Sequence, residues 1–309
     1  MDTSPHRSEF VNVDSGVRLH YLDWGGDGPA LLFLAGLGTT AHIFDQFAPR
    51  FVDRFRVLAL TRRGHGESDY PDTGYNLDTL IEDIRQFLDA LKIEQVILVG
   101  HSMAGIELSH FAVIYPQRVL KLVYLDAAYD RTAPAFKAMQ AKNPLAHIQP
   151  PGVNDDHYTI EDYIAANKRA SPALAAIWSE VMEVEVRHSV TVNTEGKIVD
   201  KMSDAIGAAL HETIVHYAPE DAQIQAPVLS FFALTEGAAF LADFMSTEQQ
   251  AQVIEFFDTV RTPWLRAWIE EYRRKVPHAR IVEIPNGHHM CFIQQADIVA
   301  EEMRRFLTE

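Results

Sequence analysis

The segment that decides the fold is QVILVGHSMAGIELSHFAVIY, residues 95–115. It begins with a continuous apolar run, 95–100, which is typical of a strand buried on both faces of a sheet. A helical stretch follows, so Ser102 lies on a sharp strand-to-helix turn within GHSMAG. Such a turn exposes the serine hydroxyl, and the small residues Gly100 and Ala104 let the strand and the helix approach closely. Because the start of a helix also stabilises negative charge, the segment predicts a nucleophilic serine.

Similar apolar runs recur on both sides of this segment. Two of them flank the turn Asp14-Ser15-Gly16 and favour an N-terminal hairpin. Between the later runs lie helical patterns, most clearly at 77–91, where leucine and isoleucine recur three or four residues apart. This alternation predicts βα units of a largely parallel sheet, an α/β fold. The eight expected strands lie at 10–13, 17–24, 30–36, 55–60, 95–100, 120–127, 227–234 and 279–284.

The pattern changes between the sixth and the seventh of these runs. From 130 to 225 the sequence favours helices separated by Pro, Asn and Gly, with few strand-like runs. The sheet pattern then resumes. We therefore expect one core domain, formed by 1–129 and 226–309, that is interrupted by a helical cap insertion at 130–225.

Composition narrows the class of protein. The 309 residues are 47% hydrophobic, which suits a large buried core and excludes a disordered or fibrous protein. Lys and Arg number 27 against 43 Asp and Glu, so the net charge is −16. This charge repels phosphate backbones and anionic lipid surfaces, and it argues against nucleic acid as a partner.

The sequence also shows no recognisable targeting signal. It has no run of eighteen or more apolar residues, and its first ten residues lack the apolar stretch of a secretory signal. The only cysteine, Cys291, can form neither an internal disulfide nor a cysteine-based metal cage. We expect a cytoplasmic protein without a membrane span.

Three blocks of the sequence resemble the α/β-hydrolase superfamily, which includes serine esterases, lipases and C–C hydrolases. LAGLG at 34–38 is similar to the oxyanion turn of this superfamily, RGHGES at 63–68 to its R-G-x-G-x-S loop, and GHSMAG to its nucleophile turn. Ala35 replaces the usual His of the oxyanion turn, Thr61 stands where an Asp often precedes the Arg, and Ala104 replaces the last Gly of the nucleophile turn. None of these departures removes a reactive group.

The resemblance implies both an architecture and an anion site. The architecture is a mostly parallel eight-stranded sheet with helices on both faces and an inserted helical cap. The anion site is an oxyanion hole formed by the backbone N–H groups of Leu37 and Met103, a function that backbone can serve whatever the side chain.

The resemblance places the general base after the last strand, where an imidazole can reach the serine at the carboxyl edge of the sheet. Two histidines are candidates within IPNGHHM at 284–290. The spacing from the proline and the following phenylalanine favour His289, whereas the usual Gly-His pairing favours His288. We prefer His289 and keep His288 as the alternative.

The triad acid also has two candidates. In most relatives it follows the strand after the cap, where Glu236 has the expected spacing but lacks the expected Gly-x-x-Asp turn. Asp126 ends the strand next to the nucleophile strand and resembles the position that some lipases and dehalogenases use. A strand-end Asp also often caps the next segment. We prefer Asp126, with Glu236 as the alternative.

Other charged residues receive weaker interpretations. We expect Arg63 to brace neighbouring loops, and the sequence leaves open whether Glu107 faces the pocket or the solvent. His211 and His216 are five positions apart, which places them about 140° apart around a helix, so they do not form a metal-binding pair.

Together these features predict a serine hydrolase that cleaves a carboxylic ester or a similarly activated carbonyl through an acyl-enzyme on Ser102, with no cofactor and no metal. A serine nucleophile argues against epoxide hydrolase and haloalkane dehalogenase activity, which in this fold uses an aspartate at that position. The alternatives are a C–C bond hydrolase, a proline-releasing aminopeptidase, a hydroxynitrile lyase and a non-catalytic small-molecule receptor. The expected partner is a small-molecule ester or acyl substrate; the sequence specifies neither its chain length nor the oligomeric state.

Overall fold

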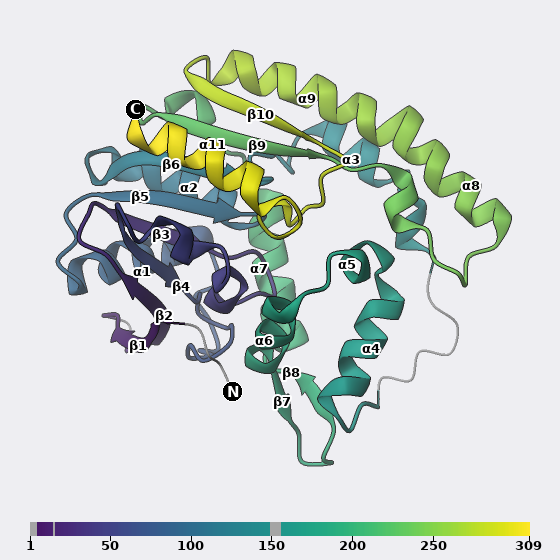
Figure 1. The fold of residues 1–309 in the computed structure, drawn as a ribbon, viewed down its shortest axis with the longest axis horizontal. Helices are drawn as coiled ribbons and strands as arrows, with labels where there is room; N and C mark the ends of the chain where they lie inside the picture. Colours follow the sequence, from purple (N-terminus) through teal and green to yellow (C-terminus); the bar gives the residue numbers. More distant parts are fainter. Residues whose placement is uncertain (1–4, 15, 149–155) are drawn as a thin grey trace.

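The computed structural model describes residues 5–14, 16–148 and 156–309, and an eight-stranded sheet forms its centre (Figure 1). The strands are β1 (Arg7–Asn12), β2 (Arg18–Gly25), β3 (Ala30–Leu34), β4 (Arg56–Leu60), β5 (Val96–His101), β6 (Val119–Leu125), β9 (Val228–Leu234) and β10 (Ala279–Pro285). Their spatial order is β1-β2-β4-β3-β5-β6-β9-β10. β1, β2 and β4 pair antiparallel, and the remaining pairs are parallel. The predicted α/β fold and all eight predicted strands are confirmed.

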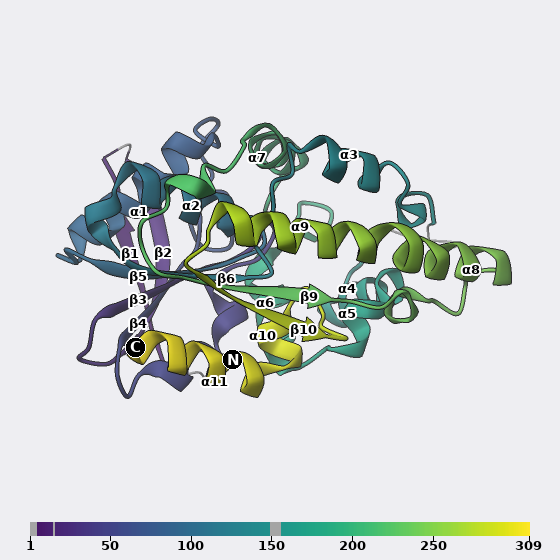
Figure 2. The ribbon, with the colours of Figure 1, turned by 90° about the horizontal axis from the view of Figure 1, so that it is seen from above.

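Helices cover both faces of this sheet. Figure 2 shows α1 (Leu77–Ala90), α2 (Ala104–Ile114) and α9 (Thr262–Lys275) on one face and α11 (Ala296–Thr308) on the other. Each face has its own apolar cluster, which explains why the central strands read as continuous apolar runs rather than alternating ones. Hydrophobic residues of α1 lie on the side that packs on the sheet, and Asn76 caps its first turn by accepting a hydrogen bond from the amide of Thr79.

The residues between β6 and β9, 130–225, are here named the β6–β9 segment. Its described part contains α3 (Pro134–Gln140), α4 (Ile160–Ala170), α5 (Pro172–Ala176), α6 (Glu180–Ser189) and α7 (Asp204–His216), and Figure 1 shows α4 to α6 grouped at one end of the sheet. A short hairpin, β7 (Val190–Val192) and β8 (Ile198–Asp200), was not expected from the sequence, because each strand is only three residues long. Residues 149–155 of the predicted cap and Ser15 of the predicted turn lie outside the described residues.

The rest of the chain completes the core. α8 (Thr247–Phe256) joins α9 through a π-helical turn, and α10 (Cys291–Gln294) precedes α11. The parallel strands direct their carboxyl ends to one edge of the sheet, the edge at which ligands bind in open α/β folds. No helix within the described residues is long and apolar enough to span a membrane.

Candidate active site

Ser102 occupies a strained turn between β5 and α2. Its φ is +55°, in the left-handed region that L-residues rarely adopt, and its side chain is half-buried. The turn requires a small residue at position 100, because a Cβ on Gly100 would lie 2.8 Å from Leu108 Cδ1 and 3.1 Å from Ala104 Cβ. The local sequence therefore produces the exposed, constrained serine of a nucleophile turn.

The helix that follows Ser102 is pressed against the end of β6. A Cβ built on Gly105 would lie 2.0 Å from the carbonyl oxygen of Ala127, a distance that no side chain can occupy. Gly105 thus lets α2 touch the residue that immediately follows Asp126. This contact brings the acid-bearing turn next to the serine-bearing turn.

Asp126 and His289 form a direct pair across this edge of the sheet. Asp126 Oδ2 lies 2.6 Å from His289 Nδ1. The carboxylate is buried, with 3% of its side chain exposed, whereas the imidazole is 44% exposed. A carboxylate can only accept, so His289 donates to it through Nδ1–H, and Nε2 is the ring nitrogen that is left to act on a substrate or nucleophile. The pair has the chemistry of an oriented general base.

Asp126 is held by further donors. The hydroxyl of Tyr129 and the backbone N–H of Ala233 on β9 both donate to Oδ1, the latter at 2.9 Å. Burial alone would raise the pKa of Asp126, but the hydrogen bond and charge of His289, with these two donors, hold it below its usual value. Asp126 is therefore ionised at neutral pH. Tyr129 was not singled out by the sequence, and only its position three residues after the acid could have suggested it.

His101, the residue before the serine, supports the backbone of His289. Its Nε2 donates to the carbonyl oxygen of His289 at 3.1 Å, and the two rings lie 4.5 Å apart. Burial, with the nearby imidazole of His289, lowers the pKa of His101 well below its usual value, so the ring is neutral. This role of His101 was not predicted from the sequence, although its place inside GHSMAG was a signal.

The two alternative residues lie elsewhere. The side chain of Glu236 is exposed at the start of a short helical turn after β9, and within the described residues it forms no hydrogen bond or ion pair with either histidine. His288 Nδ1 accepts the backbone N–H of Met290 at 2.9 Å. Burial and the neighbouring His289 lower the pKa of His288 to about 4. The geometry thus joins Asp126 to His289, and it joins neither Glu236 nor His288 to a triad.

The turn at 36–38 lies against the serine. A Cβ on Gly36 would be 3.1 Å from Ser102 Cβ and 3.0 Å from His101 Nδ1, so this turn is in close contact with the nucleophile. The backbone N–H groups of Leu37 and Met103 donate to no group in the described part of the chain. Two unsatisfied amides beside a serine suit a developing oxyanion.

A buried ion pair fastens this turn to the serine helix. Arg62 Nε donates to Glu107 Oε1 at 2.7 Å, and Arg62 Nη2 donates to both Glu107 Oε2 and, at 2.9 Å, the carbonyl oxygen of Ala35. Glu107 therefore faces the interior, which the sequence left open. The expected loop brace, Arg63, pairs with Asp83 of α1 through two bonds of 2.6 Å. Arg62, for which the sequence predicted no role at the site, braces the turn at 36–38 through Ala35.

The comparisons with known proteins identify the family of this chain. The family model described as "alpha/beta hydrolase fold" matches residues 29–296. The chain belongs to the α/β-hydrolase-fold family. The matched range includes the turn at 36–38, Ser102, Asp126 and His289.

Two curated relatives illustrate the range of this family. The haloalkane dehalogenase of Mesorhizobium japonicum is 30% identical over 185 residues, which cover 59% of this chain and 59% of that protein. The 2-(acetamidomethylene)succinate hydrolase of the same organism is 34% identical over 117 residues, 38% of this chain and 42% of that protein. The aligned stretches thus span about half the length of these relatives.

Solved structures share the fold over nearly the whole chain. E-2-(acetamidomethylene)succinate hydrolase superposes with a TM-score of 0.74 at 22% identity, covering 98% of this chain and 100% of that one. A marine microorganism esterase gives a TM-score of 0.62 at 21% identity, covering 93% and 98%. This likeness establishes the common architecture.

In this α/β-hydrolase the β6–β9 segment is hydrogen-bonded to the loop that follows the turn at 36–38. The backbone N–H of Thr40 donates to Glu185 Oε1 of α6 at 2.8 Å, and the Thr40 hydroxyl donates to Oε2 at 2.6 Å. His188, also on α6, lies 2.8 Å from Glu67. Through its hydrogen bonds to Thr40, α6 fixes the loop that follows the turn at 36–38.

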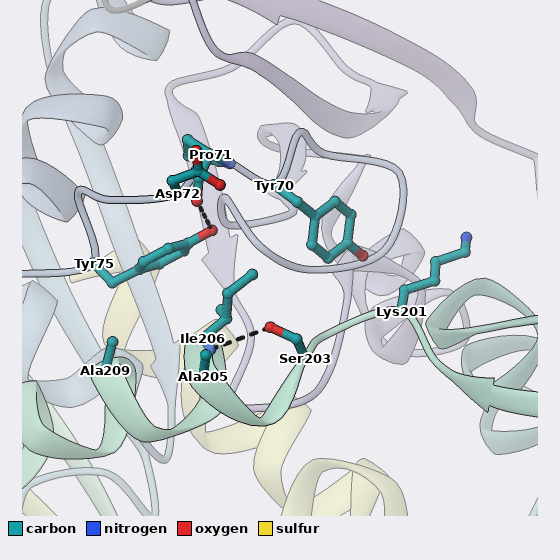
Figure 3. A pocket seen from close by; sticks show the side chains of 9 residues that line it. All are labelled: Tyr70, Pro71, Asp72, Tyr75, Lys201, Ser203, Ala205, Ile206 and Ala209. Atoms are coloured by element: carbon teal, nitrogen blue, oxygen red, sulfur yellow. Dashed lines mark hydrogen bonds between the residues drawn. The ribbon is translucent and has the colours of Figure 1, made fainter. Parts of the chain in front are cut away.

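Two hollows lie along the same junction. One has a volume of about 340 Å³. Figure 3 shows that Tyr70 and Tyr75, from the loop between β4 and α1, lie across it from the start of α7, where Ile206 is located. Tyr75 is fixed there because its hydroxyl donates to the carbonyl oxygen of Pro71 at 2.7 Å. A smaller hollow of about 120 Å³ lies between Gly38, in the turn at 36–38, and the β6–β9 segment, which contributes Ser189, Asp200 and Met202.

Histidine and carboxylate side chains also gather away from the triad. Two overlapping groups bring possible metal-ligand atoms within 4.8 Å of one another: His6, His42 and Asp45, and His20, His42 and Glu67. Imidazole and carboxylate are suitable zinc ligands, so these groups are where a metal could bind. They share no residue with the Asp126–His289 pair.

Proposed function

We propose that this α/β-hydrolase is a serine hydrolase that cleaves a carboxylic ester or a similarly activated carbonyl through an acyl-enzyme on Ser102. The observation that carries the proposal is the 2.6 Å pairing of the buried Asp126 with His289 at the sheet edge that also bears Ser102. Ser102 supplies the nucleophile, His289 the base and Asp126 the orienting carboxylate.

The proposed first step forms the acyl-enzyme. Ser102 Oγ attacks the carbonyl carbon while His289 Nε2 takes the hydroxyl proton, and the backbone N–H groups of Leu37 and Met103 stabilise the oxyanion. His289 then gives this proton to the leaving alkoxide, the ester C–O bond breaks, and alcohol departs. In the second step water attacks the acyl-enzyme with the same base, releasing the acid and restoring Ser102.

The buried charge of Asp126 explains why it suits this cycle. Its ionised carboxylate stabilises the imidazolium that forms in each step, and its bonds to Tyr129 and Ala233 keep it in place without satisfying Oδ2, which stays with His289. The β6–β9 segment would act as a cap over the acyl group. No step requires a metal or a cofactor.

The chemistry of residue 102 separates this proposal from the named activity of one relative. Haloalkane dehalogenase activity in this fold uses an aspartate as nucleophile, and this chain presents a serine hydroxyl instead. The 2-(acetamidomethylene)succinate hydrolase and the marine esterase are named for hydrolysis of acyl substrates, which supports the acyl-transfer proposal.

The test compares matched variants in the hydrolysis of p-nitrophenyl esters. Asp126→Asn should lower kcat by about 10³-fold or more, since loss of the triad acid leaves the imidazole in the wrong tautomer. Glu236→Gln is the matched control and should keep wild-type turnover. Likewise His289→Ala should abolish turnover and His288→Ala should retain most of it. Greater damage from Glu236→Gln or His288→Ala would overturn the assignment.

A further inference from the structure

Arg131 lies one aromatic ring away from the candidate triad. It follows β6 in the loop that leads to α3, and its guanidinium carbon is 6.0 Å from the ring centroid of Tyr129. The hydroxyl of the same Tyr129 donates to Asp126. A positive charge therefore stands beside the acid of the site, on the first loop of the β6–β9 segment.

Arg261 is a second arginine of this region, and it comes from a distant part of the chain. It ends the π-helical turn η7 (Phe257–Arg261) between α8 and α9, and its guanidinium carbon is 5.1 Å from the Phe257 ring centroid. Single π-helical turns are rare in proteins, and those that occur often lie at functional sites. This turn sets the direction of the residues that lead into α9.

The two arginine-bearing segments are in contact. Trp264, three residues after Arg261, lies 6.0 Å from Tyr129 and 5.5 Å from Phe136, ring centroid to ring centroid. Tyr129, Phe136 and Trp264 thus form one aromatic cluster, and Arg131 packs on its Tyr129. Burial and Asp126 raise the pKa of the Tyr129 hydroxyl, and the charges of Arg261 and Arg131 both oppose this rise, so both guanidinium groups lie near the hydroxyl that bonds Asp126.

Both guanidinium groups carry a buried N–H without a partner. The Nη1 atoms of Arg131 and Arg261 are enclosed and make no hydrogen bond to any described residue. Leaving such a charged donor unsatisfied is costly, and natural proteins rarely do so without a ligand or ion to complete it. Burial lowers the pKa of Arg131, which expresses the same cost.

The two arginines of the described residues that are buried as whole side chains, Arg62 and Arg63, are both paired. Arg62 is bonded to Glu107 and Arg63 to Asp83, each through two nitrogen atoms. The unfinished hydrogen bonding of Arg131 and Arg261 is therefore a local property of the region around Tyr129, and it is not a general feature of how this chain buries arginine.

We propose that Arg131 and Arg261 bind a carboxylate of the substrate, so that the preferred substrate is the half-ester of a dicarboxylic acid or a similarly anionic acyl compound. Arginine forms bidentate hydrogen bonds with carboxylates, and it does so best where water is excluded. The site also gives an anionic substrate a local attraction within a protein of net charge −16. This inference rests on the proposed function, because it names the substrate class of the same site.

The test uses two esters of equal chain length: the mono-p-nitrophenyl ester of glutarate, which ends in a carboxylate, and neutral p-nitrophenyl valerate. The wild-type protein should favour the glutarate ester in kcat/KM by about tenfold or more, since a charge-assisted hydrogen bond contributes at least that factor. The preference should fall as salt is raised, because salt screens the attraction. A wild-type protein that favours the valerate ester would overturn the inference.

Variants locate the carboxylate site. Arg131→Gln and Arg261→Gln should each lower the glutarate-to-valerate ratio by about tenfold, mainly through a higher KM for the glutarate ester. Arg131→Lys keeps the charge and should retain part of the preference. Arg266→Gln removes an exposed positive charge from α9, the helix that follows Arg261, and should leave the ratio unchanged. Equal ratios in Arg131→Gln, Arg261→Gln and the wild type would contradict the assignment.

A binding measurement separates the two proposals. Calorimetric titration of glutarate into Ser102→Ala needs no turnover, and it should show binding that Arg131→Gln weakens about tenfold. Binding with this loss, together with a wild-type protein that hydrolyses neither ester, would support the anion site and reject the acyl-enzyme proposal. Ester hydrolysis without glutarate binding would reject the anion site and leave the acyl-enzyme proposal standing.

Discussion

His101 Nε2 donates to the carbonyl oxygen of His289 across 3.1 Å, so the residue before the candidate nucleophile holds the backbone of the candidate base. The two histidines are 188 positions apart in the chain. A neutral imidazole can donate from Nε2 without placing a charge in the interior. Burial lowers the pKa of His101 and so keeps the ring neutral, which suits it to this position. A direct hydrogen bond therefore links the serine turn to the base loop.

Replacement of His101 tests this coupling. His101→Ala should lower kcat by about 10- to 100-fold with little change in KM, because a base displaced by a fraction of an ångström still lets substrate bind. His101→Gln keeps an N–H donor and should recover part of kcat. Steady-state kinetics on one p-nitrophenyl ester give both constants. A change in KM alone would contradict the positioning role.

The Arg62–Glu107 pair should stabilise the folded protein only as a pair. Arg62→Met or Glu107→Met alone leaves one buried charge without its partner, which typically costs about 3–5 kcal/mol of the free energy of unfolding. The double replacement Arg62→Met with Glu107→Met removes both charges and should recover much of this loss. Urea denaturation of the four proteins completes the cycle. Additive losses would show that the two side chains act independently.

Gly105 should be irreplaceable, unlike another helical glycine. Gly105→Ala places a Cβ 2.0 Å from the carbonyl oxygen of Ala127, so the helix or the turn at Asp126 must shift, and we expect lower stability and lower kcat. Gly207 of α7 is the matched control, since its added Cβ would meet only Met202 Cε, at 3.6 Å. Gly207→Ala should raise stability by about 0.5–1 kcal/mol. Thermal unfolding and ester turnover compare the two, and equal effects would refute the close contact.

Acid should destabilise the fold partly through His65. Burial and the charge of Arg62 lower the pKa of His65 from 6.5 to about 3, and its Nε2 accepts the backbone N–H of Gly38 at 3.1 Å. Below pH 6.5 the unfolded chain binds a proton at this residue that the folded protein does not, so stability falls as the pH falls towards 3.

The matching variant is His65→Gln, which cannot take up this proton. Between pH 7 and pH 5 the free energy of unfolding of the wild type should fall about 2 kcal/mol more than that of the variant. Urea denaturation at pH 7, 6 and 5 measures both slopes. Parallel pH profiles would show that His65 does not contribute to acid destabilisation.

The sheet could be predicted from sequence because its signal is local. The central strands are buried on both faces and appear as continuous apolar runs, and the glycine-flanked Ser102 marks a strand-to-helix turn without reference to any distant residue. Asp126 could be proposed for a similar reason, since it ends a strand adjacent to the serine strand. The short β7–β8 hairpin lacked such a signal.

The contacts that complete the site depend on residues far apart in the chain. Glu107 could not be oriented from α2, because this helix is buried on nearly every side and has no polar face to mark its direction. The roles of His101 and Arg62 likewise depend on backbone carbonyls brought close by the folded chain. Periodicity and motif spacing carry no information about such partners.

Fluorophosphonate labelling tests the central claim most directly. Intact protein, treated with the reagent and analysed by peptide mass spectrometry, should carry one phosphonyl group on Ser102, and Ser102→Ala should carry none under the same conditions. Asp126→Asn should label much more slowly, because the oriented base activates the serine. A well-folded wild-type protein that remains unlabelled, or labels equally fast after Ser102→Ala, would contradict an activated serine at this position.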